Sequence, residues 1–427
     1  MRTTITKDIA AFPNFTNQLL SWANQFREVV LLDSNAYHQK YSSYDVVVAV
    51  DAFTSLQTDC TNAFQDLQQY QSQTKDWLFG YLSYDLKNDI EDLHSDNFDG
   101  LAFPDLFFFQ PKKLFLIKGN QVEIQYLRMC DDEIESDFEE ILSTTFIAHH
   151  PSSITINQRI SKESYLLKVS KMLEHIQRGD IYEANFCMEF YAENTKIDPL
   201  EMYHKLNAIS EAPFAVYFKN AAHYLLSASP ERYLRKEGLK VISQPIKGTA
   251  KRSFDLGQDE HFKSDLAQNE KERSENIMIV DLVRNDLSHT ATKGSVQVEE
   301  LCEVYTFKQV HQMISTIVSE VENTTSPVEI IRTTFPMGSM TGAPKISAMQ
   351  IIEALEETKR GLYSGAVGYF TPSGDFDFNV VIRSILYNAK KEYLSFSVGS
   401  AITALAMPEN EYEECLLKAK AMFEVLR

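Results

Sequence analysis

The sequence predicts a mixed α/β protein, and three observations support this fold class. Short apolar runs rich in Val, Phe, Tyr and Leu, each of the length of one strand, recur along the chain. Stretches with helical spacing of their apolar residues occur between them, mainly in the second half. Hydrophobic residues make up 44% and charged residues 24% of the 427 residues, a composition typical of globular enzymes.

The first 150 residues are predicted to be rich in strands. Runs of β-branched and aromatic residues predict strands at 29–34, 44–50, 77–84, 106–109 and 113–117. Two polar stretches between or after these runs predict helices. They are the Gln-rich segment 53–74 and the acidic segment 131–140. We expect the acidic segment to be solvent-exposed.

The remainder of the chain is predicted to alternate helices and strands. Residues 165–176 form an amphipathic helix that ends at Gly179, where a glycine cap belongs. Further helices are predicted at 270–287, 346–355 and 411–426. Strands are predicted at 180–187, 214–218, 224–227, 361–370 and 378–386, and residues 241–252 are predicted to be a strand that turns into a loop. Pro230 predicts a turn at Ser229–Arg232, in which Glu231 by itself is expected to be solvated.

The pentapeptide Pro245–Thr249, Pro-Ile-Lys-Gly-Thr, admits two interpretations of its lysine. Most lysines are exposed, so Lys247 by itself is expected to be solvated or to bind an anion. Alternatively, desolvation or a neighbouring cation favours the neutral amine, which is a nucleophile.

Three other features indicate bound charges. Glu275 lies on the apolar stripe of the predicted helix 270–287, so it needs a cation, either an arginine or a hard metal such as Mg²⁺. Arg383 interrupts an apolar strand and needs an anion, which a structural carboxylate can also supply. The glycine-punctuated loop 335–345 leads into a helix, as an anion-binding loop or an ordinary turn does.

Charge and cysteine content exclude several classes of function. The net charge of −19 argues against a nucleic-acid partner. No apolar run is long enough for a signal sequence or a membrane span, so we expect a cytoplasmic protein without membrane contact. The five cysteines contain no CxxC pair, and we expect them to be reduced core residues rather than zinc ligands.

Six motifs identify a family by their order along the chain. They are Ser229–Arg232, Pro245–Thr249, Glu275–Asp286, Gly338–Lys345, Gly365–Gly368 and Glu411–Glu414. In this order they resemble the chorismate-utilising enzymes, in particular the aminodeoxychorismate synthase branch. The resemblance is strong over residues 155–425 and weaker at Leu31–Ser34 and Gly80–Asp85, segments that in some members hold a tryptophan.

The resemblance implies a large α/β (α+β) fold, in which two antiparallel sheets form a sandwich with helices packed outside. Residues 1–150 would form its amino-terminal part and residues 151–427 the chorismate-binding catalytic region, within one compact unit. Anthranilate synthases resemble this chain but carry alanine at the position of Lys247.

The resemblance also implies roles for individual residues. Lys247 would attack chorismate as a covalent nucleophile and Glu231 would be the general acid, with Thr249 as a further catalytic residue. Glu275 and Glu414 would hold Mg²⁺. Periodicity alone predicts exposed ion pairs for Glu411, Glu414 and Lys418, and for Glu414 the metal-binding role implied by the resemblance takes precedence over that prediction. The implied substrate-binding residues are Ser339, Thr341, Gly342, Tyr363, Arg383, Gly399 and Lys418.

Three residues depart from the family pattern. Glu183 stands where glutamine is usual, Gln312 where a second histidine is usual, and Ala401 where a glycine is usual. Because Gln312 replaces this histidine, any role that the histidine plays near the leaving hydroxyl is in doubt. A buried, protonated Glu183 could supply a compensating hydrogen bond, and Ala401 could crowd the carboxylate site.

The resemblance implies amination of chorismate to 4-amino-4-deoxychorismate for the synthesis of 4-aminobenzoate and folate. Ammonia would come from a separate glutamine amidotransferase subunit, because no cysteine here lies in a nucleophile-elbow context. An anthranilate synthase component or a salicylate- or isochorismate-forming relative is an alternative, and an inactive chorismate-binding protein is another. Tryptophan binding, a lyase step and the oligomeric state are left open by the sequence.

Overall fold

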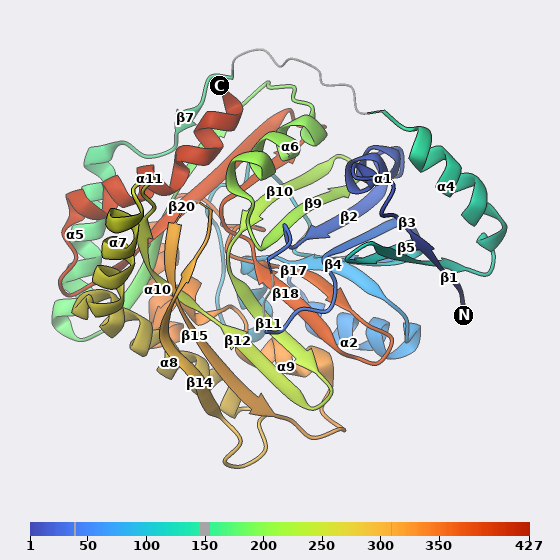
Figure 1. Cartoon of the computed structure of the whole chain (residues 1–427). Helices are drawn as coiled ribbons and strands as arrows, with labels where there is room; N and C mark the ends of the chain where they lie inside the picture. Colours follow the sequence, from blue (N-terminus) through green and yellow to red (C-terminus); the bar gives the residue numbers. More distant parts are fainter. Residues whose placement is uncertain (38–39, 146–153, 309) are drawn as a thin grey trace.

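The computed structural model describes residues 1–37, 40–145, 154–308 and 310–427. Its strands form one continuous antiparallel sheet system that bends into two halves (Figure 1). The two long strands β3 (Val46–Thr58) and β5 (Leu106–Lys118) belong to both halves. Their register shifts between Ala52 and Thr54, opposite Pro111, and such an irregularity bends paired strands.

The first half-sheet runs from the amino terminus to the strand that carries Glu183. Its strand order is β1–β6–β5–β3–β2–β9–β10–β19–β20–β8, with the short β7 and β16 also paired to β8. The bounds are β1 Arg2–Asp8, β2 Glu28–Asp33, β6 Gln121–Leu127, β7 Asn157–Gln158, β8 Glu183–Ala192, β9 Phe214–Asn220, β10 His223–Ser229, β16 Gly342–Ala343, β19 Ser384–Asn388 and β20 Tyr393–Thr403.

The second half-sheet carries Lys247. Its strand order is β3–β5–β4–β17–β18–β11–β12–β15, and β15 also pairs with β13 and β14. The bounds are β4 Leu78–Leu82, β11 Arg232–Glu237, β12 Lys240–Gln244, β13 Ile246–Lys251, β14 Gln297–Thr306, β15 Val310–Glu320, β17 Ala366–Phe370 and β18 Phe376–Val380.

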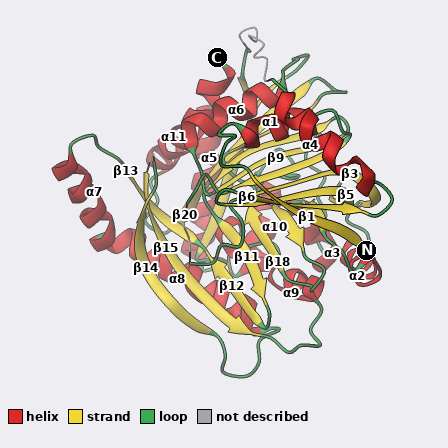
Figure 2. Ribbon diagram, turned by 45° about the vertical axis from the view of Figure 1, so that its right-hand side comes forward, coloured by secondary structure: helices red, strands yellow, loops and turns green. Residues whose placement is uncertain are grey.

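Helices cover the outer faces (Figure 2). Those packed on the first half-sheet are α1 Phe15–Ala23, α4 Ile134–Ser143, α5 Lys162–Arg178, α6 Pro199–Ser210, α10 Lys345–Leu355 and α11 Pro408–Leu426. Those that add apolar side chains to the other core are α2 Ala63–Thr74, α8 Glu270–Ser288 and α9 Pro327–Thr334. The remaining helices are α3 Lys87–Ile90, α7 Leu256–Gln268 and the 3₁₀ turns η1 Tyr84–Leu86, η2 Asp131–Glu133 and η3 Gly338–Met340.

The predicted fold class, with two antiparallel sheets and helices outside, is confirmed. The four predicted helices of the second part are present as α5, α8, α10 and α11, and Gly179 caps α5 with φ 83°. The predicted boundary at residue 150 lies outside the described residues. Two pairings, β2 with β9 and β4 with β17, connect strands from before it to strands from after it.

Four local predictions are wrong in their boundaries. Residues 53–58 extend β3, so the helix predicted from residue 53 begins only at Ala63. The two strands predicted at 106–117 are one strand, because Pro111 lies at the irregular pairing with β3. The part of 241–252 predicted as a loop forms a second strand, β13, which Pro245 separates from β12, and the strand predicted at 378–386 breaks after Val380.

Burial of the acidic helix also differs from the prediction. Phe138 and Ile141 of α4 are buried against the first core, so only one side of this helix is solvent-exposed. Within the residues described, no helix combines the length and apolarity needed to cross a membrane.

Candidate active site

Lys247 forms a buried ion pair with Glu183. The Nζ atom of Lys247, on β13, donates a hydrogen bond to Oε1 of Glu183, the first residue of β8, over 2.7 Å. The side chains are 11% and 2% exposed. Burial by itself lowers the pKa of Lys247, but the charges of Glu183, Glu275 and Glu231 outweigh it and raise this pKa above its ordinary value. In this state Lys247 is an ammonium ion, because its neighbours are carboxylates rather than a cation.

Glu183 therefore does not act as the sequence suggested. Its Oε1 accepts a hydrogen bond from Lys247, whereas the expected protonated carboxyl would have donated one. Its Oε2 is buried and has no hydrogen-bond partner among the described residues. The two residues lie 64 positions apart in the chain, so local sequence gave no signal for this contact.

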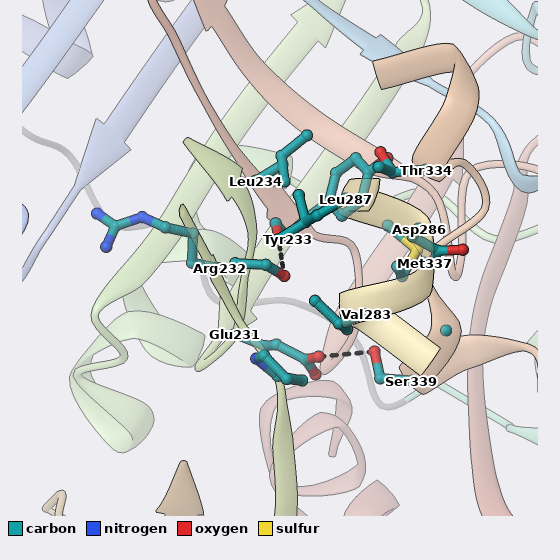
Figure 3. A pocket seen from close by; sticks show the side chains of 13 residues that line it. Glu231, Arg232, Tyr233, Leu234, Val283, Asp286, Leu287, Thr334, Met337 and Ser339 are labelled. Carbon is teal, nitrogen blue, oxygen red and sulfur yellow. Dashed lines mark hydrogen bonds between the residues drawn. The ribbon is translucent and has the colours of Figure 1, made fainter. Parts of the chain in front are cut away.

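Glu231 is buried in the turn between β10 and β11 rather than solvated, and only 4% of it is exposed. Its Oε1 accepts a hydrogen bond from Oγ of Ser339 over 2.7 Å (Figure 3). Burial raises the pKa of Glu231 to about 7, although Ser339, Lys247 and the backbone of Ile246 favour the ionised form. Glu231 can therefore hold or release a proton near neutral pH.

A small cavity adjoins this carboxyl group (Figure 3). Its walls include the apolar side chains of Leu234, Val283, Leu287 and Met337. Burial of the carboxyl group beside this largely apolar cavity is the physical cause of its raised pKa.

The glycine-punctuated loop is fixed to β8. The backbone N–H of Asn185 donates to the carbonyl of Thr341 over 2.8 Å, and β16 pairs with the start of β8. A Cβ atom on Gly342 would lie 2.1 Å from the carbonyl oxygen of Glu183, so only glycine fits there. The loop thus sets Ser339 and Glu183 relative to each other.

A cluster of carboxylates lies between α8 and α11. Nζ of Lys271 lies 3.8 Å from Oε1 of Glu275 and 3.8 Å from Oε1 of Glu411. Burial raises the pKa of Glu275 to about 7, and burial also raises the pKa of Glu411. The prediction from periodicity that Glu411 is exposed is wrong, since it is 3% exposed. Sequence reasoning missed Lys271 altogether and did not place Glu411 in the site.

Glu414 is the more exposed of the two predicted metal ligands. Its Oε1 lies 2.6 Å from Nζ of Lys418, one helical turn away, as periodicity predicted. Burial would raise the pKa of Glu414, but Lys418 outweighs burial and lowers it.

The chemistry of these groups fits a hard divalent cation. Oε1 of Glu275 is buried and accepts no hydrogen bond from any described residue, which leaves an oxygen for Mg²⁺. The described part of the chain contains no group of three or more His, Cys, Asp or Glu residues that could hold a metal. One or two carboxylates with water and ligand oxygens is the usual set for Mg²⁺.

Arg383 is a cation that lacks an anionic partner. It lies between β18 and β19 with φ 53°, outside the strand in which it was predicted. Its Nη1 donates to the carbonyl of Lys418 over 3.4 Å, and no described carboxylate lies within ion-pair distance. Burial lowers the pKa of Arg383. A guanidinium in this position favours a bound anion.

Other predicted residues surround Arg383. Tyr363 is buried, and its hydroxyl accepts a weak hydrogen bond from Sγ of Cys187 over 3.9 Å. Nζ of Lys418 donates to the carbonyl of Gly399 on β20 over 2.8 Å. A Cβ atom on Gly399 would lie 2.6 Å from Sγ of Cys187.

Two predicted residues lie apart from this arrangement. Thr249 is exposed on β13, where it pairs with Gln312. Oγ1 of Thr341 donates to the backbone of its own loop, at Met337 and Gly338. The roles predicted for both residues stay predictions.

The other two residues that depart from the family pattern, Gln312 and Ala401, lie on strands. Gln312 is buried on β15, and no described residue bonds to its Oε1. Ala401 lies on β20 opposite Asn185.

A second cavity lies at the amino-terminal motif. Asp33 and Ser34 line it together with Pro213, Phe214 and Arg232. It encloses about 590 Å³, counted with the space open to solvent. Burial raises the pKa of Asp33 to about 6. Neither Lys247 nor Glu183 lines this cavity.

Comparison with known proteins places the chain in a family. Residues 27–424 match the model of the chorismate binding enzymes. Aminodeoxychorismate synthase component 1 of Bacillus subtilis (strain 168) is 30% identical over 388 residues, which cover 88% of this chain and 80% of that protein. The probable chloroplastic aminodeoxychorismate synthase of Oryza sativa subsp. japonica is 34% identical over 81% of this chain, which spans 43% of that longer protein.

A solved structure supports the same fold. Anthranilate synthase component I from Streptococcus pneumoniae TIGR4 superposes with a TM-score of 0.79 at 22% sequence identity, over 91% of this chain and 94% of that one. The family match over most of the chain, together with the Bacillus subtilis relative, identifies this protein as a member of the chorismate binding enzyme family.

Proposed function

We propose that this protein aminates chorismate with ammonia to 4-amino-4-deoxychorismate. The observation that carries the proposal is Lys247 within the site, since the resemblance places alanine there in anthranilate synthases. Family membership and the names of the Bacillus subtilis and rice relatives support the same reaction.

Lys247 is the proposed covalent nucleophile. Its amine attacks C2 of the chorismate ring, the ring double bonds shift, and the bond from C4 to the hydroxyl oxygen breaks. Ammonia then attacks C4 and the bond from C2 to Lys247 breaks, which leaves the amine on the carbon that carried the hydroxyl. A single displacement would place the amine on the wrong ring carbon, whereas two successive displacements place it on C4.

Glu231 is the proposed general acid. With a pKa of about 7 it is partly protonated at neutral pH, and the protonated form gives its proton to the departing 4-hydroxyl oxygen, which leaves as water. The hydrogen bond from Ser339 holds the carboxyl group in place.

The cationic residues account for substrate binding. Arg383 binds the enolpyruvyl carboxylate, and the support is that no described carboxylate lies within ion-pair distance of it. Tyr363, Gly399, Lys418 and the loop with Ser339, Thr341 and Gly342 complete the proposed substrate pocket.

Glu275 and Glu414 are the proposed protein ligands of Mg²⁺. When bound, the metal neutralises the ring carboxylate of chorismate and orients it. Glu275 would provide its buried Oε1, which accepts no hydrogen bond from any described residue, and water would supply further oxygen ligands.

We further propose that ammonia comes from a separate glutamine amidotransferase subunit, and that the product enters 4-aminobenzoate and folate synthesis in the cytoplasm. Anthranilate formation is the enzymatic alternative, because the Streptococcus pneumoniae structure is an anthranilate synthase component. A chorismate-binding protein without turnover is the alternative of another class.

The test is incubation of the purified chain with chorismate, Mg²⁺ and an ammonium salt at alkaline pH, with products identified by mass spectrometry. We expect a product that retains the enolpyruvyl group and carries an amine in place of the hydroxyl. Lys247→Ala should lose or divert this product, and a chelator should abolish it. Anthranilate with pyruvate, or unchanged chorismate, would contradict the proposal.

A further inference from the structure

The proposed chemistry meets a difficulty in the resting structure. A lysine attacks carbon only as the neutral amine, yet Lys247 is held as an ammonium ion by the carboxylates around it. The proton must therefore leave Nζ before the bond to the substrate forms.

The contacts of Lys247 identify one acceptor for this proton. Within the described residues, Glu183 is the group that accepts a hydrogen bond from Nζ, over 2.7 Å. Both side chains are largely buried, which hinders direct transfer of the proton to bulk water. A glutamine, usual at this position in the family, accepts a hydrogen bond but not a proton.

Among the described residues, Lys247 is the hydrogen-bond partner of the Glu183 carboxyl group. Its Oε2 has no hydrogen-bond partner among the described residues, so its ionised form relies on Lys247 for stabilisation. Transfer of the proton converts two poorly solvated charges into a neutral acid and a neutral amine, which lowers the cost of burial. The position of Glu183 is also fixed, because β8 pairs with both β16 and β20 at this end.

We infer that Glu183 is a catalytic residue that accepts the Nζ proton of Lys247 and returns it at the end of each cycle. This inference rests on the proposed function. In the first step the ammonium and carboxylate become amine and carboxylic acid, and the nitrogen lone pair then forms the bond to C2. Glu231 gives its proton to the leaving oxygen.

The remaining protons also balance. Attack leaves Lys247 as a secondary ammonium, and when ammonia forms the new bond at C4, Lys247 departs with its electron pair as a neutral amine. The new C4 ammonium group returns a proton to Glu231, and Glu183 returns its proton to Lys247. The sum is chorismate plus ammonia giving the amine and water.

The experiment compares Glu183→Gln with wild type from pH 6.5 to 8.5 at a constant concentration of free ammonia. In wild type the proton moves within the pair, whereas in the variant it must be lost to solvent. We therefore expect the ratio of variant to wild-type turnover to rise about ten-fold per pH unit, from a value well below one at pH 6.5.

The ratio of variant to wild-type turnover cancels the pH dependence that other charged groups near Lys247 contribute equally to both proteins. These are Glu231 in the β10–β11 turn, Glu272 and Glu275 on α8, and Glu414 on α11, all present in both proteins. Glu189→Gln is the matched control, because Glu189 is a buried carboxylate of the same strand that bonds to Arg159 instead. The ratio of Glu189→Gln turnover to wild-type turnover should not change with pH.

Two outcomes would overturn the inference, and a third would overturn both proposals. A ratio independent of pH, or a variant faster than wild type at every pH, would show that Glu183 only holds the ammonium. Absence of aminated product from wild type would remove the proposed function itself. The unfolding temperature and chorismate affinity of Glu183→Gln should match wild type, which separates the effect from misfolding.

Discussion

At the scale of single residues, the burial of Glu231 has a consequence for stability. Its pKa is about 4.5 when unfolded and about 7 in the native protein. Between these values the native state keeps a proton that the unfolded state has lost, so stability contributed by this residue falls as pH rises through this window.

Glu231→Gln should therefore gain stability relative to wild type at pH 8 but not at pH 4. The gain has a ceiling of roughly 3 kcal/mol, because one pKa unit corresponds to about 1.4 kcal/mol. Urea unfolding at both pH values measures it. Glu329→Gln is the control, since Glu329 forms a surface pair with Arg332 and should show no such gain. Equal effects of Glu231→Gln at both pH values would contradict the assigned pKa.

Arg383 gives a second prediction at this scale. Arg383→Gln should weaken chorismate binding about thirty-fold, since loss of a charged partner of a carboxylate costs about 2 kcal/mol. Calorimetric titration without ammonia measures the affinity. The unfolding free energy should not fall, because the guanidinium has no carboxylate partner among the described residues.

Arg332→Gln is its control, because this exposed arginine pairs with Glu329 on α9, and it should bind chorismate like wild type. A variant at residue 383 with unchanged affinity but lower stability would instead make Arg383 a structural residue.

The site residues differ in how far sequence could predict them. The family resemblance named Glu231, Lys247, Glu275 and Arg383, but residue pattern alone assigned Glu231 and Glu411 to solvent. Both are buried because of elements distant in sequence, and local spacing contains no information about such contacts. The pairing of Glu183 with Lys247 was unpredictable for the same reason.

At the scale of elements, the short pairing of β16 with β8 positions the proposed nucleophile and its partner. Gly342→Ala should lower the unfolding free energy by about 2 kcal/mol or more, because its Cβ atom would collide with the backbone of Glu183 and Ala184. Displacement of Glu183 from Lys247 should also lower turnover at least ten-fold. Chemical denaturation and the amination assay measure the two effects.

Gly179→Ala is the matched control. The same substitution there meets no neighbouring atom, and only the left-handed backbone at φ 83° opposes it. It should cost about 1 kcal/mol and leave turnover unchanged. Equal turnover in the two variants would show that the loop does not position the site.

Elements were predictable from sequence where a local signal defines them. The spacing of apolar residues and a glycine cap located α5, because both act within the helix itself. The ends of β3, β5 and β13 were missed, since a bulge and a proline there act through pairing with other strands. The family resemblance implied two antiparallel sheets but not the order of their strands, because most pairings join segments that are distant in sequence.

At the scale of the whole molecule, the site depends on both half-sheets. Glu183 lies at the edge of the first half-sheet and Lys247 on the second, and the ion pair joins them. The strands β3 and β5 connect the same halves far from the site. The geometry of the nucleophile therefore depends on the folding of the complete sandwich.

This connectivity predicts that the chain unfolds in one cooperative transition. Residues before and after the predicted boundary share two central pairings, β2 with β9 and β4 with β17, and they share both hydrophobic cores. A fragment of residues 154–427 alone would expose these strand edges and lack more than a third of the buried residues of each core, so it should not fold. Urea unfolding followed by circular dichroism and by tryptophan fluorescence should give coincident curves for the whole chain, because both tryptophans, Trp22 and Trp77, lie in the amino-terminal part. Separate midpoints for the two probes, or a fragment with a cooperative transition of its own, would instead divide the protein into two independent domains.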